Sequence, residues 1–209
     1  MKAHTQETQS TMTPEKSLQF LKEGNDRFVK NLKANRNLLE QVNDTKEGQF
    51  PFATILSCID SRVSAELVFD QGLGDIFSVR IAGNFVNEDI LGSMEFACKL
   101  AGTKLIVVLG HTSCGAVKGA CDHAEMGNLT KLIQKITPAV NAVTEPKDES
   151  LRNSKNLDFV DTVSKKNVEL TIERIHKESP ILDEMEKNGE IRIIGAMYNI
   201  NTGAVEFYD

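Results

Sequence analysis

Short apolar runs along the chain predict strands that are buried on both faces. They occupy residues 52–56, 76–81 and 104–109, and uninterrupted runs of this kind are typical of parallel sheets. The run at residues 104–109 gives the strongest signal because it is rich in β-branched side chains. Residues 191–208 contain two further runs around an Asn-Thr-Gly turn, and this pattern predicts a terminal hairpin.

Between these runs the apolar residues recur at helical spacing. Thr13 followed by Pro14 is typical of a helix start, with an N-cap residue and proline at the first helical position. We expect this helix to continue to about Leu32. Residues 88–100 predict a second helix, and residues 157–175 form an amphipathic pattern that predicts a third.

Strands that alternate with helices predict an α/β fold. We expect a mainly parallel central sheet of about five strands, the last one antiparallel, flanked by helices. The 209 residues fit a single domain. Within it, residues 1–48 are expected to form an N-terminal tail and helical arm, and residues 49–209 the catalytic α/β core.

Charge and composition exclude several classes of partner. The formal net charge is −6 and the chain has no basic run, which argues against nucleic acid and anionic membranes as partners. No stretch reaches the length of a membrane span. Residues 1–12 are polar and lack the apolar segment of a secretory signal. We therefore expect a cytoplasmic protein, or a periplasmic one if a signal was removed.

Three residues with metal-ligand chemistry follow two of the predicted strands. Cys58 follows the run at residues 52–56, and His111 and Cys114 follow the run at residues 104–109. Carboxyl ends of parallel strands share one edge of a sheet, where ligands bind. Two thiols and one imidazole are good zinc ligands, but closed structural sites have four. The set therefore indicates a catalytic zinc with a position left for water or a carboxylate.

Asp60 and Arg62 accompany Cys58 and suggest how such a zinc would be used. Taken alone, Asp60-Ser61-Arg62 also fits a turn in which Asp60 or Ser61 caps a helix. Beside a zinc ligand, Asp60 can accept a hydrogen bond from zinc-bound hydroxide while Arg62 restrains the carboxylate through a bidentate contact. If Arg62 releases it, Asp60 can become a fourth zinc ligand and close the site.

Together these motifs resemble the β-class carbonic anhydrases. The similarity includes Cys58-x-Asp60-x-Arg62 and His111-x-x-Cys114-Gly115, and it extends over about residues 49–120. The resemblance implies one zinc ion per chain, held by the two cysteines and the histidine, with Asp60 and Arg62 as the catalytic dyad. It also implies the activity of a carbonate dehydratase, a zinc lyase that hydrates carbon dioxide reversibly to bicarbonate and a proton through a zinc-bound hydroxide.

The same resemblance implies a substrate pocket and an assembly. Matching positions give Phe77 and Phe96 as apolar walls and Gln49 as an amide donor to substrate. The family forms homodimers, often doubled into homotetramers, and some pocket residues come from the neighbouring chain. Some members also have a noncatalytic bicarbonate site that stabilises a closed form, and a tryptophan three residues before the first zinc cysteine helps to build it. Ile55 takes that position here, so we expect an open site near neutral pH.

Two other functions fit the same residues. A hydrolase of carbonyl sulfide or carbon disulfide would use the same ligands and dyad and differ in pocket shape. A noncatalytic zinc-binding module would use Asp60 as a permanent fourth ligand, although Arg62 then has no purpose. The substitution Asp60→Asn separates a catalytic dyad from a noncatalytic zinc module. A catalytic dyad loses activity and keeps zinc, whereas a structural fourth ligand loses metal affinity or folding. A redox dithiol is disfavoured because the chain has no Cys-x-x-Cys.

Overall fold

The structure, a computed structural model, describes residues 2–208. A single sheet has the strand order β2-β1-β3-β4-β5. Strands β1 to β4 pair in parallel and β5 pairs antiparallel to β4, so the predicted α/β class and sheet are confirmed. The strands are β1 (Ala53–Ser57), β2 (Ile76–Arg80), β3 (Leu105–His111), β4 (Arg192–Tyr198) and β5 (Val205–Phe207).

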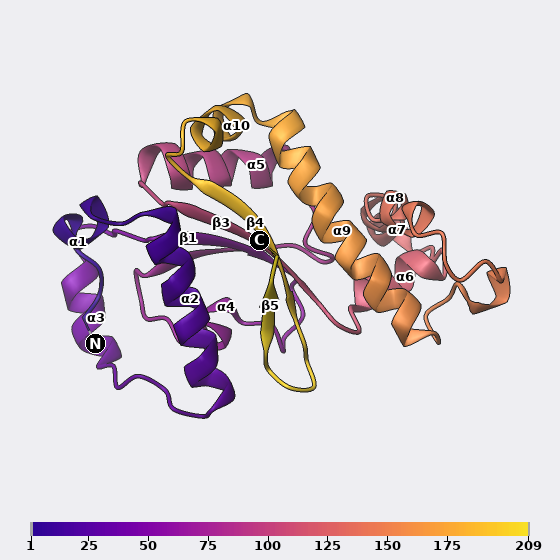
Figure 1. Cartoon of the computed structure of the whole chain (residues 1–209), viewed down its shortest axis with the longest axis horizontal. Helices are drawn as coiled ribbons and strands as arrows, with labels where there is room; N and C mark the ends of the chain where they lie inside the picture. The colour runs from indigo at the N-terminus through magenta and orange to yellow at the C-terminus, as the bar shows by residue number, and fades with distance from the viewer. Residues whose placement is uncertain (1, 209) are drawn as a thin grey trace.

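Helices cover both faces of this sheet (Figure 1). The N-terminal arm carries α1 (Gln6–Ser10), α2 (Pro14–Val29) and α3 (Leu38–Thr45), and the short α4 (Ala65–Val68) follows β1. Between β2 and β3 lie α5 (Glu88–Glu95) and the π-helical η1 (Phe96–Leu100). The remaining helices are α6 (Gly115–Cys121), α7 (Gly127–Ile133), α8 (Thr137–Ala142), the 3-10 turn η2 (Glu149–Leu151), α9 (Leu157–Glu178) and α10 (Pro180–Lys187).

Alternate residues of the central strands point to opposite faces, which explains the uninterrupted apolar runs. Ile55 of β1 packs in a core with residues of α2 and α4. The next residue, Leu56, packs in a second core with residues of α5, α9 and α10. Because both faces of β1 and β3 are covered, every residue of these two strands is buried.

Two strand glycines let α9 lie against the sheet. A Cβ atom on Gly110 of β3 would lie 2.7 Å from Cγ2 of Val168 and 2.6 Å from Sδ of Met197. A Cβ atom on Gly195 of β4 would lie 2.8 Å from Cγ1 of Val168. No side chain fits at such distances, so both positions need glycine. The close approach fixes α9 relative to the carboxyl ends of β1 and β3.

Two predicted helices differ from the observed ones, and a third helix was not predicted. The helix expected to reach Leu32 ends at Val29, and Asn31 follows with a left-handed φ of 55°. The helix expected over residues 88–100 is α-helical only to Glu95. The last turn widens to a π-helix, in which Ala101 N–H bonds to Phe96 O. Helix α3 was missed because its apolar side chains are largely exposed.

In the part of the chain that the structure describes, no helix has the length and apolar character needed to cross a membrane.

Candidate metal centre and catalytic dyad

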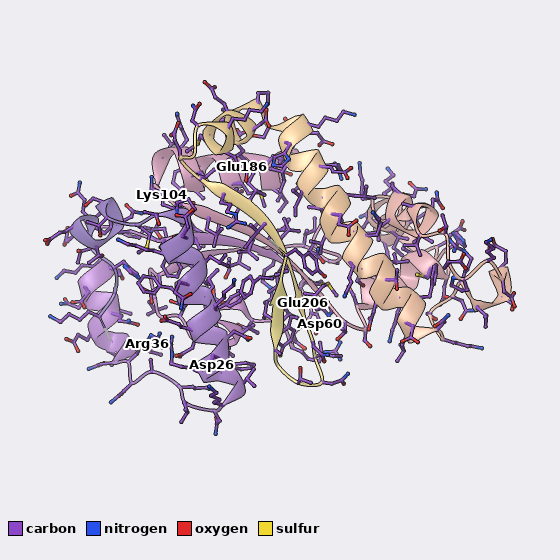
Figure 2. All side chains as sticks on the ribbon, viewed as in Figure 1. Asp26, Arg36, Asp60, Lys104, Glu186 and Glu206 are labelled. Atoms are coloured by element: carbon purple, nitrogen blue, oxygen red, sulfur yellow. The ribbon has the colours of Figure 1, made fainter. Side chains whose placement is uncertain are left out.

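The three candidate ligands meet at one edge of the sheet. Cys58 follows β1, His111 is the last residue of β3, and Cys114 precedes α6. Strands β1 and β3 are adjacent and parallel, with Ser57 beside Leu109. The segments that follow these two strands therefore leave the sheet on the same side. Figure 2 shows the two ends of the sheet, with Lys104 labelled before β3 and Asp60 after β1.

The ligand atoms lie at distances that suit a tetrahedral metal ion. All three atoms are within 4.8 Å of one another, and Sγ of Cys58 is 3.9 Å from Sγ of Cys114. Two Zn–S bonds of about 2.3 Å at a tetrahedral angle place the sulfurs about 3.8 Å apart. His111 is fully buried, as the two cysteines nearly are. The separation therefore matches zinc without rearrangement.

The His111 ring presents the correct nitrogen to this cluster. Its Nδ1 lies 3.0 Å from the carbonyl oxygen of Thr112 and donates to it, because a carbonyl can only accept. The lone pair is then on Nε2, which is buried and has no hydrogen-bond partner among the described residues. A buried imidazole nitrogen without a partner costs free energy, and a metal ion removes that cost. The donor set therefore fits zinc.

Electrostatics divide the four cysteines into two pairs. A hydrogen bond from Cys114 lowers the pKa of Cys58 to about 4, and the N–H of Gly83 lowers it further. The pKa of Cys114 is raised because that thiol donates to Cys58 and is buried. Burial raises the pKa values of Cys98 and of Cys121 to about 11. Only the clustered pair provides a thiolate, the form that binds metals.

Arg62 holds the Asp60 carboxylate beside the cluster in a bidentate contact. Arg62 Nε donates to Oδ1 at 2.9 Å and Nη2 donates to Oδ2 at 2.7 Å, and the backbone N–H of Arg62 also donates to Oδ1. These hydrogen bonds hold the pKa of Asp60 well below its usual range. Oδ2 lies 4.0 Å from Nε2 of His111. Asp60 therefore faces the metal position but is engaged by arginine.

The alternative in which Asp60 or Ser61 caps a helix is wrong. Helix α4 begins at Ala65 and its N-cap residue is Ser64. Asp60 does begin a turn, since its carbonyl oxygen accepts the N–H of Val63 at 2.9 Å. Its side chain remains available for Arg62.

Three residues that the sequence did not assign to the site support its loops. Arg80 donates to the carbonyl oxygens of Cys58 and Asp60, at 3.0 and 2.7 Å. From α9, Asp161 Oδ1 accepts the N–H of Ser113 at 2.7 Å, and Asn167 Nδ2 donates to Gly83 O at 2.8 Å. Arg80 lies in the stretch similar to the family. The α9 residues have no local signal, since they lie 48 and 84 positions from their partners.

Comparison with known proteins decides the family. The family model described as carbonic anhydrase matches residues 53–205. "Carbonic anhydrase 2" of Mycobacterium tuberculosis is 35% identical over 195 residues, which cover 90% of each chain. A carbonic anhydrase of Mycolicibacterium smegmatis is 35% identical over 192 residues, or 89% of each chain. The chain belongs to the β-carbonic anhydrase family.

Solved structures share this fold. A β-carbonic anhydrase of Aspergillus fumigatus has a TM-score of 0.71 and 24% identity, with 82% of this chain and 81% of that chain covered. The Coccomyxa β-carbonic anhydrase in complex with acetazolamide has a TM-score of 0.68 and 25% identity, with 79% and 75% covered. A tetrameric β-carbonic anhydrase of Sordaria macrospora has a TM-score of 0.67 and 22% identity, with 78% and 82% covered.

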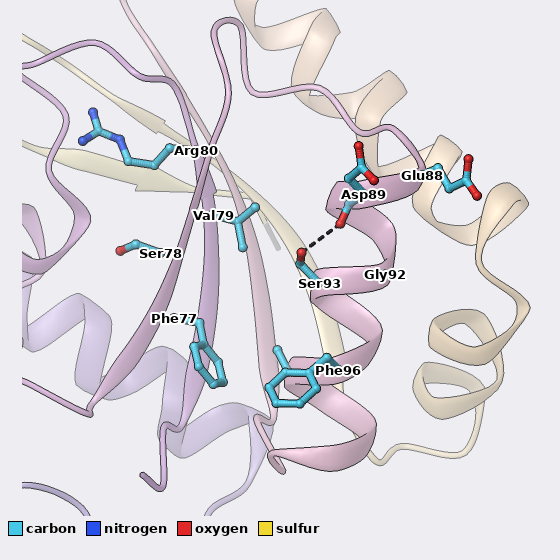
Figure 3. A pocket seen from close by; sticks show the side chains of 10 residues that line it. Phe77, Ser78, Val79, Arg80, Glu88, Asp89, Gly92, Ser93 and Phe96 are labelled. Atoms are coloured by element: carbon cyan, nitrogen blue, oxygen red, sulfur yellow. Dashed lines mark hydrogen bonds between the residues drawn. The ribbon is translucent and has the colours of Figure 1, made fainter. Parts of the chain in front are cut away.

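The residues expected to line the pocket of a β-carbonic anhydrase lie elsewhere in this chain. Phe77 pairs with Thr54, four positions before Cys58, so it lies roughly 13 Å from the cluster at about 3.3 Å per residue. The rings of Phe77 and Phe96 are 6.4 Å apart and line a groove of about 830 Å³ between β2 and α5 (Figure 3). Gln49 is exposed and precedes β1. The structure thus separates these three residues from the cluster within one chain.

Proposed function

We propose that this chain is a zinc-dependent carbonic anhydrase that hydrates carbon dioxide reversibly to bicarbonate and a proton. The observation that carries the proposal is the buried cluster of Cys58, His111 and Cys114 with a carboxylate held beside it by Arg62. Zinc, when bound, supplies a positive charge that acidifies water and stabilises negative charge on oxygen. The chain's own residues supply the rest of the chemistry.

Asp60 orients the attacking water. Its pKa is lowered by Arg62, so it remains an ionised acceptor throughout the physiological pH range. Two of the hydrogen bonds from Arg62 fix Oδ1 and one engages Oδ2, which leaves Oδ2 a lone pair toward the metal position. A hydrogen bond to Oδ2 then directs the oxygen lone pair of the water at the substrate carbon.

This engagement of Asp60 by Arg62 supports an open site near neutral pH. A carboxylate that serves as a permanent fourth ligand would be expected within the cluster, whereas the cluster contains only two thiols and one imidazole. The pairing with arginine therefore favours a catalytic role over a noncatalytic zinc module. Ile55, in place of a tryptophan beside the site, is consistent with the same state.

The apolar walls of the substrate pocket are proposed to come from a second copy of the chain. Phe96 is half exposed on the groove with Phe77. In the N-terminal arm, Leu38 and Leu39 are also exposed, at 55% and 81%, which is costly unless a partner covers them. A homodimer in which the arm and groove meet the neighbouring chain would bring each groove to the other's metal centre. Two such dimers can form a tetramer.

The primary test is carbon dioxide hydration by stopped-flow from pH 6 to 9. Zinc-loaded protein is compared with Asp60→Asn and with Asp26→Asn, an exposed aspartate on α2 that serves as the matched control. We expect activity in the parent and the control, a large loss in Asp60→Asn, and one zinc per chain in all three. Inactivity of the zinc-loaded dimer would contradict the proposal, and turnover of carbonyl sulfide instead would identify the sulfur-substrate alternative.

Mixed dimers test whether the pocket is shared between chains. One chain carries His111→Ala and the other carries Phe77→Ala with Phe96→Ala, with different tags so that the mixed dimer can be purified. If the walls act across the interface, the mixed dimer regains one intact site and about half of the parent activity. If they act within one chain, its activity does not exceed that of the phenylalanine variant.

A further inference from the structure

Helix α9 supports both loops that carry the candidate metal ligands. Asp161 bonds to the loop between His111 and Cys114, and Asn167 bonds to the loop that contacts Cys58. We propose that Asp161 and Asn167 are positioning residues that set the direction of the metal ligands without touching the metal. The inference rests on the proposed zinc site and assigns a function to two side chains on a distant helix.

Asp161 stabilises a backbone conformation that Ser113 does not adopt readily. Ser113 has a φ of 54°. This left-handed backbone conformation is unfavourable for most residues other than glycine and asparagine. Its N–H donates to Oδ1 of Asp161 at 2.7 Å. Only Thr112 and Ser113 separate His111 from Cys114. A relaxation at Ser113 would therefore change the direction of both ligands.

Asn167 acts on Cys58 through one intervening residue. Its Nδ2 donates to Gly83 O at 2.8 Å, and Gly83 N–H donates to Sγ of Cys58 at 3.4 Å. Gly83 has a φ of 79°, and a Cβ atom there would lie 2.3 Å from Cδ1 of Ile136. Asn167 is 97% buried, since only 3% of it is exposed. Asn167 thus holds a confined residue, Gly83, whose N–H donates to Sγ of Cys58.

Helix α9 is held in a fixed position against the sheet, so the two side chains have a rigid support. The helix extends over 22 residues, and Asn156 caps its first turn by accepting the N–H of Phe159. Gly110 and Gly195 admit Val168 against the sheet, so the helix cannot slide without steric overlap. Both hydrogen bonds end on the backbone of the ligand-bearing loops. Their loss should therefore change ligand direction more than overall packing.

The Asn167 contact is tested with Asn167→Leu, which keeps side-chain volume and removes the donor. Thr171→Val is the matched control, because Thr171 is equally buried on the same helix and is one turn from Asn167. We measure the zinc dissociation constant by chelator competition and the absorption spectrum of the cobalt-substituted protein. We expect about a tenfold weaker zinc affinity and a shifted thiolate-to-cobalt band for Asn167→Leu, with the control unchanged.

The Asp161 contact is tested by rescue. Asp161→Ala removes the acceptor, whereas Asp161→Asn retains an oxygen that can accept the N–H of Ser113. We expect Asp161→Ala to release zinc about tenfold faster and Asp161→Asn to behave as the parent. Equal zinc affinity and identical cobalt spectra in Asn167→Leu and Thr171→Val would overturn the proposal. A parent protein that binds no zinc would instead contradict the proposed function.

Discussion

Among the described residues, two aspartates are held by arginines, and the two pairs differ in separation along the chain and in exposure. Asp60 is engaged by Arg62, two residues away, and the Arg62 side chain is 52% exposed. Asp70 is engaged by Arg27 and Arg36, which lie 43 and 34 residues away. The Asp70 and Arg36 side chains are 6% and 7% exposed. Figure 2 labels Arg36 beside the N-terminal helices and Asp60 at the sheet edge.

The difference separates the proposed catalytic pair from a structural one. Asp70 receives three donors on its carboxylate, from Arg27, Arg36 and the N–H of Ala34, and it joins the N-terminal arm to the core. Among the described residues, Asp60 receives donors only from Arg62, and its Oδ2 faces the candidate ligand cluster. Both carboxyl groups have lowered pKa values. The direction of the pKa shift therefore does not distinguish the two carboxylates, whereas the location of their partners does, and it favours Asp60 for the proposed catalytic role.

The largest expected effect is on catalysis. Asp60→Asn should lower kcat/KM for carbon dioxide hydration by about 10³-fold, because an amide cannot orient the water as an ionised acceptor does. Asp70→Asn should change it by less than about twofold. The prediction is tested by measuring stopped-flow rates and zinc content for the two variants. Comparable losses in both variants, at equal zinc content, would remove the functional distinction between the two pairs.

Stability should respond in the opposite order. Asp70→Asn leaves the buried guanidinium of Arg36 facing a neutral amide, and breaking a buried ion pair in this way costs about 3 kcal/mol. Asp60→Asn should change the free energy of unfolding by less than about 1 kcal/mol, because its partner Arg62 is 52% exposed and solvent screens the pair. Urea unfolding of the metal-free proteins measures both. A larger loss for Asp60→Asn would show that the dyad also supports the fold.

The same contrast explains how much could be predicted from the sequence. The apolar run before His111 and the short spacing to Cys114 are local signals, so β3 and the cluster could be predicted. The Asp70 network could not, because it joins residues more than 30 positions apart. Asp161 and Asn167 were missed for the same reason. Long-range polar contacts depend on packing, which no local pattern encodes.

Helix α3 (Leu38–Thr45) shows a second limit of the sequence. The Asn37 side chain accepts the N–H of Glu40 and caps this helix, so a start signal was present. Its apolar residues Leu38, Leu39 and Val42 are exposed in the chain. Amphipathic periodicity identifies a helix by the face that it buries in its own core. A face that its own core leaves uncovered gives no comparable signal.

A smaller effect is expected when the geometry of the arginine changes and its charge remains. Lysine cannot form the bidentate contact that Arg62 makes with Asp60. We expect Arg62→Lys to lower kcat/KM about tenfold and to retain zinc, since the metal ligands are untouched. Arg36→Lys is the control, with a change in unfolding free energy and little change in rate. An unaltered rate in Arg62→Lys would show that charge alone holds Asp60.

The smallest effect is a change of stability with pH at the structural pair. Burial raises the pKa of Asp70, but Arg27, the N–H of Ala34 and Arg36 outweigh it, so the folded-state pKa lies below the ordinary value. Such a carboxyl stabilises the fold above its unfolded-state pKa, near 3.9. The stabilisation is lost as the pH falls through the lowered folded-state value.

We compare a protein that retains Asp70 with one that carries Asp70→Asn. The difference between their unfolding free energies should be constant above about pH 5 and shrink below about pH 4. Asp60 also has a lowered pKa, so both proteins should carry Asp60→Asn to remove its titration. Urea unfolding of the metal-free proteins at several pH values measures the difference. A difference that stays constant down to pH 3 would mean that the arginines hold Asp70 equally well in its protonated form, and the ion pair would then contribute no stability through its charge.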